Sequence, residues 1–173
     1  ALPTVLIAAV TVFVVAASDA MLGAAQAPAA KQRTVWDGVF TADQGQRGRV
    51  AFAQNCAECH NTDLTGGEGK PLTGDRFWND WRESTVDELL DRISKNMPFS
   101  EDGSLAGTLS MSTYVDLVTH ILNFNGFPAG SSELTPQSAV GVLIQAKEGP
   151  GDLPDTTLAR VVGCLERGTA PRT

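Results

Sequence analysis

Apolar residues recur at helical spacing through the middle of the chain, and their pattern predicts three principal helices. A capping box formed by Thr41 and Gln44 begins the first helix, which runs to about Asn55. Gly48 and Phe52 lie one turn apart within it. Because such a glycine costs about 1 kcal/mol of helix propensity relative to alanine, we expect it to allow the close approach of another helix.

Each of the other two predicted helices carries an apolar stripe. Thr85 and Glu88 form a second capping box, and the helix that follows ends at Met97 because Pro98 cannot continue it. The third helix is expected from about 112 to 124, where the sequence NGFP stops it. Strand signals are absent from this region, so we expect it to be mainly α-helical. The stripes comprise Val86, Leu89, Leu90 and Ile93 in one helix, and Val115, Val118, Ile121 and Leu122 in the other.

The first 27 residues differ from the rest of the chain. An unbroken apolar run, TVLIAAVTVFVVAAS, is followed by small residues that end in GAAQAPAA, as in an export signal. The alternative is an uncleaved membrane anchor, but the run over 4–17 is too short to span a bilayer and a longer one would include Asp19. Residues 1–27 are therefore predicted to be an export signal, and residues 28–40 a linker and N-terminal arm.

The sequence changes character again after residue 130. Linker-like segments, SSELTPQ and KEGPGDLPD, alternate with the short apolar runs AVGVLI and LARVVGCL, which are more typical of strands than of helices. Two interpretations fit these runs: a hairpin packed on the helical region, or a surface that docks on a partner. We therefore expect one helical domain over 41–130 and a C-terminal extension of undetermined, strand-favouring structure over 131–173.

Charge and cysteine content narrow the function. The chain of 173 residues has a net charge of −7, and its lysines and arginines are scattered, which argues against a nucleic-acid surface. Its three cysteines are Cys56, Cys59 and Cys164, and its two histidines are His60 and His120. A four-ligand zinc site would need nearly all of them. A redox-active pair of Cys56 and Cys59 is another alternative, but it leaves His60 unexplained.

The sequence CAECH, residues 56–60, is typical of covalent haem c attachment. Residues three and four positions apart share one face of a helical turn, so Cys56 and Cys59 can each form a thioether to the porphyrin while His60 turns its imidazole toward the iron. The sequence therefore predicts one covalently bound haem c. Cys164 is then left over, and we expect it to be a buried small hydrophobe, with an intermolecular disulfide as the alternative.

A haem iron held by one histidine is either open on its other side or closed by a second ligand. Met97 is the favoured second ligand, because it ends a predicted helix at the point where Pro98 starts a loop that can fold over the iron. Met111, at the start of the next helix, and His120, within it, are the rivals. The alternative role for Met97 is to fill space in the core.

With these residues in place, the segments VWDGVFTADQGQRGRVAFAQNCAECH and ILNFNGFPAG make the chain from about 35 to 127 resemble a bacterial class I c-type cytochrome. The resemblance implies a small helical fold wrapped around one haem. It also implies a crossing of the first and last helices at a glycine and an aromatic residue, for which Gly48, Phe52 and Tyr114 are the matching positions. The carbonyl of Pro71 is implied to accept the hydrogen bond from the second imidazole nitrogen of the axial histidine.

Three aromatic residues, Phe77, Trp78 and Trp81, lie between the motif and Met97. In related cytochromes an indole N–H reaches a haem propionate, so Trp78 and Trp81 are candidate haem contacts. Packing in the core is the alternative for both of them.

A histidine and methionine pair saturates the iron and leaves no position for oxygen or peroxide. The expected function is therefore that of an exported, periplasmic electron carrier rather than an enzyme. The resemblance implies a soluble or membrane-bound redox partner, with a dehydrogenase complex or a respiratory chain as candidates. Membrane contact is expected only if the N-terminal segment is uncleaved. Two alternatives remain: a haem-based sensor or small haem enzyme with an open or displaceable distal site, and a tightly bound subunit of a larger enzyme.

Overall fold

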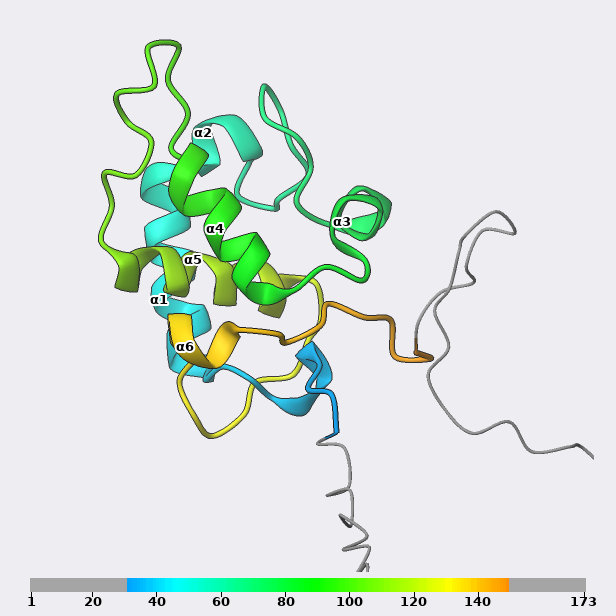
Figure 1. Ribbon diagram of the computed structural model, residues 1–173. Helices are drawn as coiled ribbons and strands as arrows, with labels where there is room; N and C mark the ends of the chain where they lie inside the picture. The colour runs from blue at the N-terminus through cyan, green and yellow to red at the C-terminus, as the bar shows by residue number, and fades with distance from the viewer. Residues whose placement is uncertain (1–30, 150–173) are drawn as a thin grey trace, which may run out of the picture. The chain divides into compact units, whose positions relative to one another are not determined.

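The computed structural model describes residues 31–149, and short helices joined by long loops make up this range (Figure 1). No strand forms within it, and the pairing of extended segments is limited to isolated bridges. The prediction of a mainly α-helical fold is thus confirmed. The elements are η1 (Val35–Asp37), α1 (Ala42–Asn55), α2 (Ala57–His60), α3 (Gly74–Trp81), α4 (Val86–Asn96), α5 (Met111–Phe124) and α6 (Pro136–Ala139).

Both predicted capping boxes are present. The Thr41 hydroxyl accepts from the Gln44 backbone N–H at 3.2 Å, and the Thr41 N–H donates to the Gln44 side chain at 3.4 Å. Thr85 and Glu88 make the same reciprocal pair at the start of α4. Each box satisfies two backbone N–H groups that the first helical turn leaves without a partner, which fixes where α1 and α4 begin.

Helices α1 and α5 cross in close contact at Gly48. A Cβ atom on Gly48 would lie 1.8 Å from the backbone oxygen of Asp116 and 2.9 Å from Cβ of His120. Phe52, one turn later, places its ring 5.2 Å from the His120 imidazole. The expected close approach at Gly48 and Phe52 is therefore present, with Asp116 and His120 opposite them, while Tyr114 makes its hydrogen bonds outside this crossing.

One hydrophobic core joins the helices. Phe40 and Phe127 are fully buried at its edge, beside the ends of α1 and α5. Helices α4 and α5 supply half of the remaining buried hydrophobic residues, because their apolar stripes face inward as predicted. The buried members from these two helices are Val86, Leu89, Leu90, Tyr114, Val115, Leu117, Val118, Ile121 and Leu122.

The first part of the C-terminal extension, residues 131–146, packs on the helices, and we call it the strap. Gln44 on α1 makes two hydrogen bonds to the strap. Its side-chain N–H donates to the Leu134 carbonyl at 2.9 Å, and its side-chain oxygen accepts from the Leu134 N–H at 2.7 Å. Leu134, Ala139, Val142 and Ile144 are all buried in the main core. This part of the extension is thus continuous with the helical domain.

The strand-like run at 139–144 forms no strand, and the second run that a hairpin would need lies outside the described residues. It contains the end of α6 and then an extended segment whose backbone groups alternate between two partners. Leu143 bonds to the N-terminal arm at Arg33 and Val35, whereas its neighbours bond to Ser84 in the loop before α4 and to Val86, the first residue of α4. Because each neighbouring segment makes only isolated backbone hydrogen bonds with this run, single β-bridges form instead of a continuous β-ladder.

Several predictions from the sequence concern residues outside the described range. These are the export signal or anchor at 1–27, the apolar run LARVVGCL and Cys164. Within residues 31–149, none of the helices has the length and apolar character needed to cross a bilayer.

Candidate haem site

The haem-attachment motif lies on a sharp break between α1 and α2. Cys56 ends α1 with its backbone N–H bonded to the Phe52 carbonyl, and its own carbonyl accepts from the Cys59 N–H at 3.2 Å and the His60 N–H at 2.9 Å. Both cysteines are free thiols and partly exposed, and His60 is 9% exposed. A single turn therefore holds two thiols and one imidazole in close proximity.

Burial and the neighbouring Cys59 raise the pKa of the Cys56 thiol to about 11. At neutral pH this side chain is consequently protonated and uncharged. An uncharged thiol suits an apolar surrounding, and Cys56 is therefore not the low-pKa thiolate that disulfide exchange favours.

The imidazole of His60 is oriented by a backbone carbonyl. Nδ1 lies 2.7 Å from the carbonyl oxygen of Lys70, and because a carbonyl only accepts, Nδ1 must carry the proton. The lone pair is then on Nε2, which is the form of histidine that ligates a metal. The structure corrects one expectation here, since the acceptor is Lys70 and not Pro71.

Pro71 still has a physical role in this hydrogen bond. A proline disfavours the helical conformation for the residue before it, which at Lys70 favours a backbone whose carbonyl can turn to the imidazole. The proline ring also lies close to the backbone of Gly66, where an added Cβ would be 2.9 Å from Pro71 Cδ. Pro71 therefore shapes the loop that supplies the acceptor.

The loop over 61–70 covers the back of the imidazole at a distance that only glycine allows. A Cβ on Gly69 would lie 2.7 to 3.0 Å from three ring atoms of His60. The loop is tied to α2 by hydrogen bonds from the Gly66 N–H to the His60 carbonyl and from the Gly69 N–H to the Cys59 carbonyl. The ring is thus held by packing as well as by its hydrogen bond.

Met97 is the C-cap of α4 and is half-buried. Its N–H donates to the Ile93 carbonyl, and its carbonyl accepts from the Tyr114 hydroxyl at 2.7 Å and from the Gly107 N–H at 3.3 Å. The same hydroxyl accepts from the Leu109 N–H at 3.4 Å. Tyr114 therefore fastens both ends of the loop that begins at Met97, a contact that the sequence alone did not indicate. The peptide bond from Met97 to Pro98 is cis.

The two rivals of Met97 lie in different surroundings. His120 is buried at the α1–α5 crossing between the rings of Phe52 and Phe124, and its Nε2 has no hydrogen-bond partner among residues 31–149. Burial and the nearby Arg49 charge lower its pKa, so this imidazole is neutral. Met111 is 49% exposed at the first turn of α5.

The tryptophans occupy three distinct positions. Trp78 meets Phe77 and Phe127 edge to face, with ring centroids 5.8 and 5.7 Å apart, and the Arg82 guanidinium lies over its ring. Trp81 is partly exposed beside α4. Trp36, which the sequence did not single out, donates its indole N–H to the Gln145 carbonyl at 2.8 Å and so fastens the strap.

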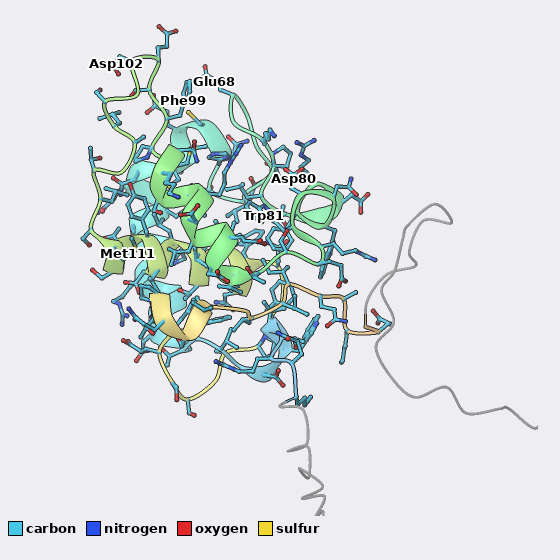
Figure 2. The ribbon with its side chains drawn as sticks, viewed as in Figure 1. Glu68, Asp80, Trp81, Phe99, Asp102 and Met111 are labelled. Carbon is cyan, nitrogen blue, oxygen red and sulfur yellow. The ribbon has the colours of Figure 1, made fainter. Side chains whose placement is uncertain are left out.

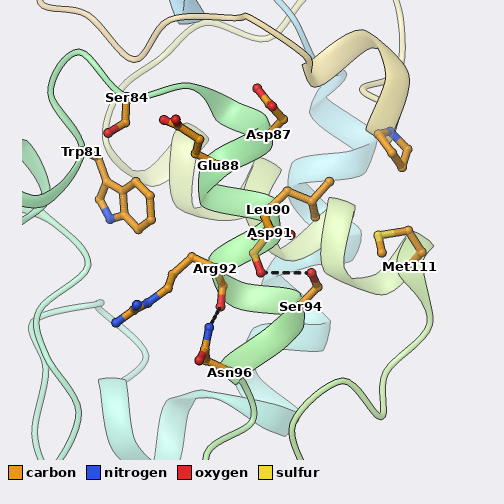
Figure 3. Close-up of a pocket in the computed structure, with 11 residues that line it drawn as sticks. Trp81, Ser84, Asp87, Glu88, Leu90, Asp91, Arg92, Ser94, Asn96 and Met111 are labelled. Atoms are coloured by element: carbon orange, nitrogen blue, oxygen red, sulfur yellow. Dashed lines mark hydrogen bonds between the residues drawn. The ribbon is translucent and has the colours of Figure 1, made fainter.

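An open depression runs beside α4 and includes Trp81 and Met111 in its lining (Figure 3). Its polar groups are largely satisfied within the helix: Ser94 bonds to the Asp91 carbonyl and Asn96 to the Arg92 carbonyl. Figure 2 shows the side chains of the described residues, with Trp81 and Met111 well separated. None of the two cysteines of the motif, His60 and Met97 belongs to its lining.

A comparison with known protein families identifies the central part of the chain. The family model described as "Cytochrome C oxidase, cbb3-type, subunit III" matches residues 43–121, which include α1, the motif, the His60 loop, Met97 and most of α5. Residues 43–121 are a class I cytochrome c domain. Such domains hold haem c covalently, so haem c with its iron is the cofactor, and the domain carries electrons rather than converting a substrate.

One curated relative is the "Cbb3-type cytochrome c oxidase subunit FixP" of Bradyrhizobium sp. (strain ORS 278), with 26% identity over 89 residues. The match covers 47% of this chain and 31% of FixP, so the chain corresponds to about a third of that relative's length. Among solved structures, the sulfane dehydrogenase SoxCD from Paracoccus pantotrophus matches with 22% identity and a TM-score of 0.46, covering 84% of this chain and 86% of the SoxCD chain.

The described residues fit a covalently bound haem. Two free thiols lie on one turn, the His60 Nδ1 is bonded to a carbonyl so that Nε2 is left for a metal, and the glycine behind the ring leaves no space for a larger residue. Haem c supplies an iron that changes between two oxidation states.

Proposed function

We propose that this chain is an exported electron carrier, with haem attached through Cys56 and Cys59 and iron ligated by His60 and Met97. The observation that carries the proposal is the hydrogen bond from His60 Nδ1 to the Lys70 carbonyl, because it leaves Nε2 as the only ring atom able to ligate. A fixed imidazole also limits rearrangement between oxidation states, which favours rapid electron exchange.

Support for Met97 comes from its anchoring. Its carbonyl is held from two sides, by Tyr114 and by Gly107, and its side chain is half-buried instead of exposed like that of Met111. A methionine on such a fixed loop can stay on the iron and exclude external ligands. We further propose that Trp78 and Trp81 line the haem pocket and that Pro71 acts through the Lys70 carbonyl.

We propose that the electrons pass to or from a larger redox complex, a dehydrogenase or a respiratory oxidase. The FixP relative is a subunit of a cbb3-type cytochrome c oxidase, which supports this class of partner. The apolar run over 4–17 supports export to the periplasm.

The test compares absorption spectra of exported wild-type protein, Met97→Ala and Met111→Ala. We expect the weak near-infrared charge-transfer band of methionine-ligated ferric haem in wild type and Met111→Ala, and its loss in Met97→Ala, because only Met97 is proposed to reach the iron. A wild-type protein that lacks the band and binds carbon monoxide has an open distal site. That result would replace the carrier with the haem-based sensor or small haem enzyme.

A second prediction concerns Tyr114, the residue that positions Met97. Tyr114→Phe removes one hydroxyl and hence its hydrogen bond to the Met97 carbonyl, at a cost of about 1 kcal/mol. On alkaline titration of the ferric protein, we expect the near-infrared band to disappear at a pH lower by roughly 0.7 unit, since 1.36 kcal/mol corresponds to about one unit. An unchanged titration midpoint would mean that Tyr114 does not position the ligand.

A further inference from the structure

The net negative charge of the described residues comes from the segment that surrounds the haem motif. Residues 58–102 contain 11 aspartates and glutamates against 5 lysines and arginines. The rest of the described range, 31–57 and 103–149, contains 5 of each and is neutral. Charge is therefore concentrated on α2, α3, α4 and the adjoining loops.

Part of this charge gathers at one end of the domain. The loop over 61–70 and the loop over 98–109 flank α2, the helix that carries the cysteines and His60 (Figure 1). Glu68 and Asp102 extend from these loops at the same end of the domain, and Phe99 lies between them (Figure 2). We call this region, α2 with the two loops, the α2 end.

Acidic residues outnumber basic ones at the α2 end by five to one. The basic residue is Lys70. The five acidic residues are all exposed: Glu58, Asp63, Glu68, Glu101 and Asp102. Hydrogen bonds from Thr65 lower the pKa of Asp63, and hydrogen bonds from Ser104 lower that of Asp102. Both carboxylates consequently keep their charge well below neutral pH.

The centre of the α2 end is apolar. Phe99 is 70% exposed and Leu105 is 49% exposed. The loop that carries them has its own hydrogen bonds, from the Leu105 N–H to Ser100 Oγ at 3.1 Å and from the Ser104 N–H to Asp102 at 3.0 Å. An aromatic ring held in water by an ordered loop is characteristic of a contact surface between proteins.

Electron exchange requires a partner to approach the cofactor closely, because tunnelling falls steeply with distance. Cys56, which caps α2, and Cys59, which lies within it, hold the haem in the proposed function and are both partly exposed. A second copy of this chain would bring like charges together at this surface, so it is disfavoured as the occupant.

We propose that the α2 end is the docking surface for a redox partner protein that presents an apolar contact surrounded by lysine and arginine side chains. This inference rests on the proposed electron-carrier function and adds the place and the charge sign of the partner. Phe99 and Leu105 supply the apolar contact, and the acidic residues steer the partner toward the haem.

The experiment uses two small oxidants as probes of the surface. Reduced holoprotein is mixed with tris(1,10-phenanthroline)cobalt(III), which is cationic with apolar ligands, or with ferricyanide, which is anionic. In each case one electron leaves the protein and reduces one metal complex. We expect the rate constant with the cobalt complex to fall as salt is added and the rate constant with ferricyanide to rise, because screening weakens attraction in one case and repulsion in the other.

Two matched double variants locate the effect. Glu68→Gln with Glu101→Gln removes two charges from the α2 end, and Glu133→Gln with Glu148→Gln makes the same change elsewhere. At low salt we expect the first variant to slow oxidation by the cobalt complex by about threefold to tenfold, and the second to change it less than twofold. Phe99→Ala should also slow oxidation by the cobalt complex. Phe124→Ala, which removes an exposed ring elsewhere, should leave that rate unchanged.

Equal rates for the two double variants, or a wild-type rate that does not depend on salt, would overturn the docking surface. The near-infrared band and the reduction potential of each variant are recorded in parallel. If they match wild type, only the docking proposal has failed. If wild type itself is not reduced and reoxidised reversibly, the proposed electron-carrier function has failed instead.

Discussion

Gly48→Ala is expected to destabilise the domain by about 3 kcal/mol or more, a large share of the roughly 5–15 kcal/mol available to a small protein. The added methyl group would lie 1.8 Å from the Asp116 backbone oxygen, so helices α1 and α5 must separate. Backbone atoms cannot rotate away as a flexible side chain can. The helix-propensity gain of about 1 kcal/mol is too small to offset this separation.

Gly45→Ala is the matched control, since it lies on the same helix and gains the same propensity. The atoms nearest to its Cβ would belong to the exposed Asn123 side chain, with Nδ2 at 3.0 Å, and that amide can move. The measurement is guanidinium unfolding of both holoproteins, followed by far-ultraviolet circular dichroism. We expect Gly45→Ala to match or exceed wild type. Equal midpoints for the two variants would show that the helices do not cross at Gly48.

Replacing Cys56 and Cys59 together by serine is expected to abolish covalently bound haem. A thioether survives denaturation and a coordinate bond does not, so haem should leave the double variant on a denaturing gel. Each single variant should keep one attachment. The measurement is haem staining of exported protein, with total protein quantified in the same lanes.

Cys164→Ser serves as the control for this prediction, because it removes the remaining thiol of the chain without touching the motif. It should keep the full haem stain. A stained double variant would instead require another attachment residue, and the role of the motif would have to be abandoned.

The sequence predicted much of the site because its signals are local. Cys56, Cys59 and His60 lie within five residues, so one helical turn is enough to bring them together. The caps at Thr41 and Thr85 depend only on residues three positions away, and both are present. The apolar stripes of α4 and α5 likewise follow from the helical period, so the interior faces were predictable.

The contacts that the sequence did not reveal are those between distant residues. Nothing near Tyr114 indicates that its hydroxyl reaches Met97, 17 residues away, nor that Gln44 would hold Leu134, 90 residues away. Such pairs depend on how α4, α5 and the strap come together. Lys70 was missed for a finer reason, since neighbouring carbonyls in a loop point in different directions and only the folded backbone selects one.

The sequence by itself thus determined the cofactor chemistry and the helical fold, because thiol spacing, capping and hydrophobic period operate over one or two turns. Only the tertiary structure decided which carbonyl orients His60, how the loop after Met97 is fastened and where charge collects around α2. These properties depend on long-range packing, in which many weak contacts act together and no single short segment holds the information.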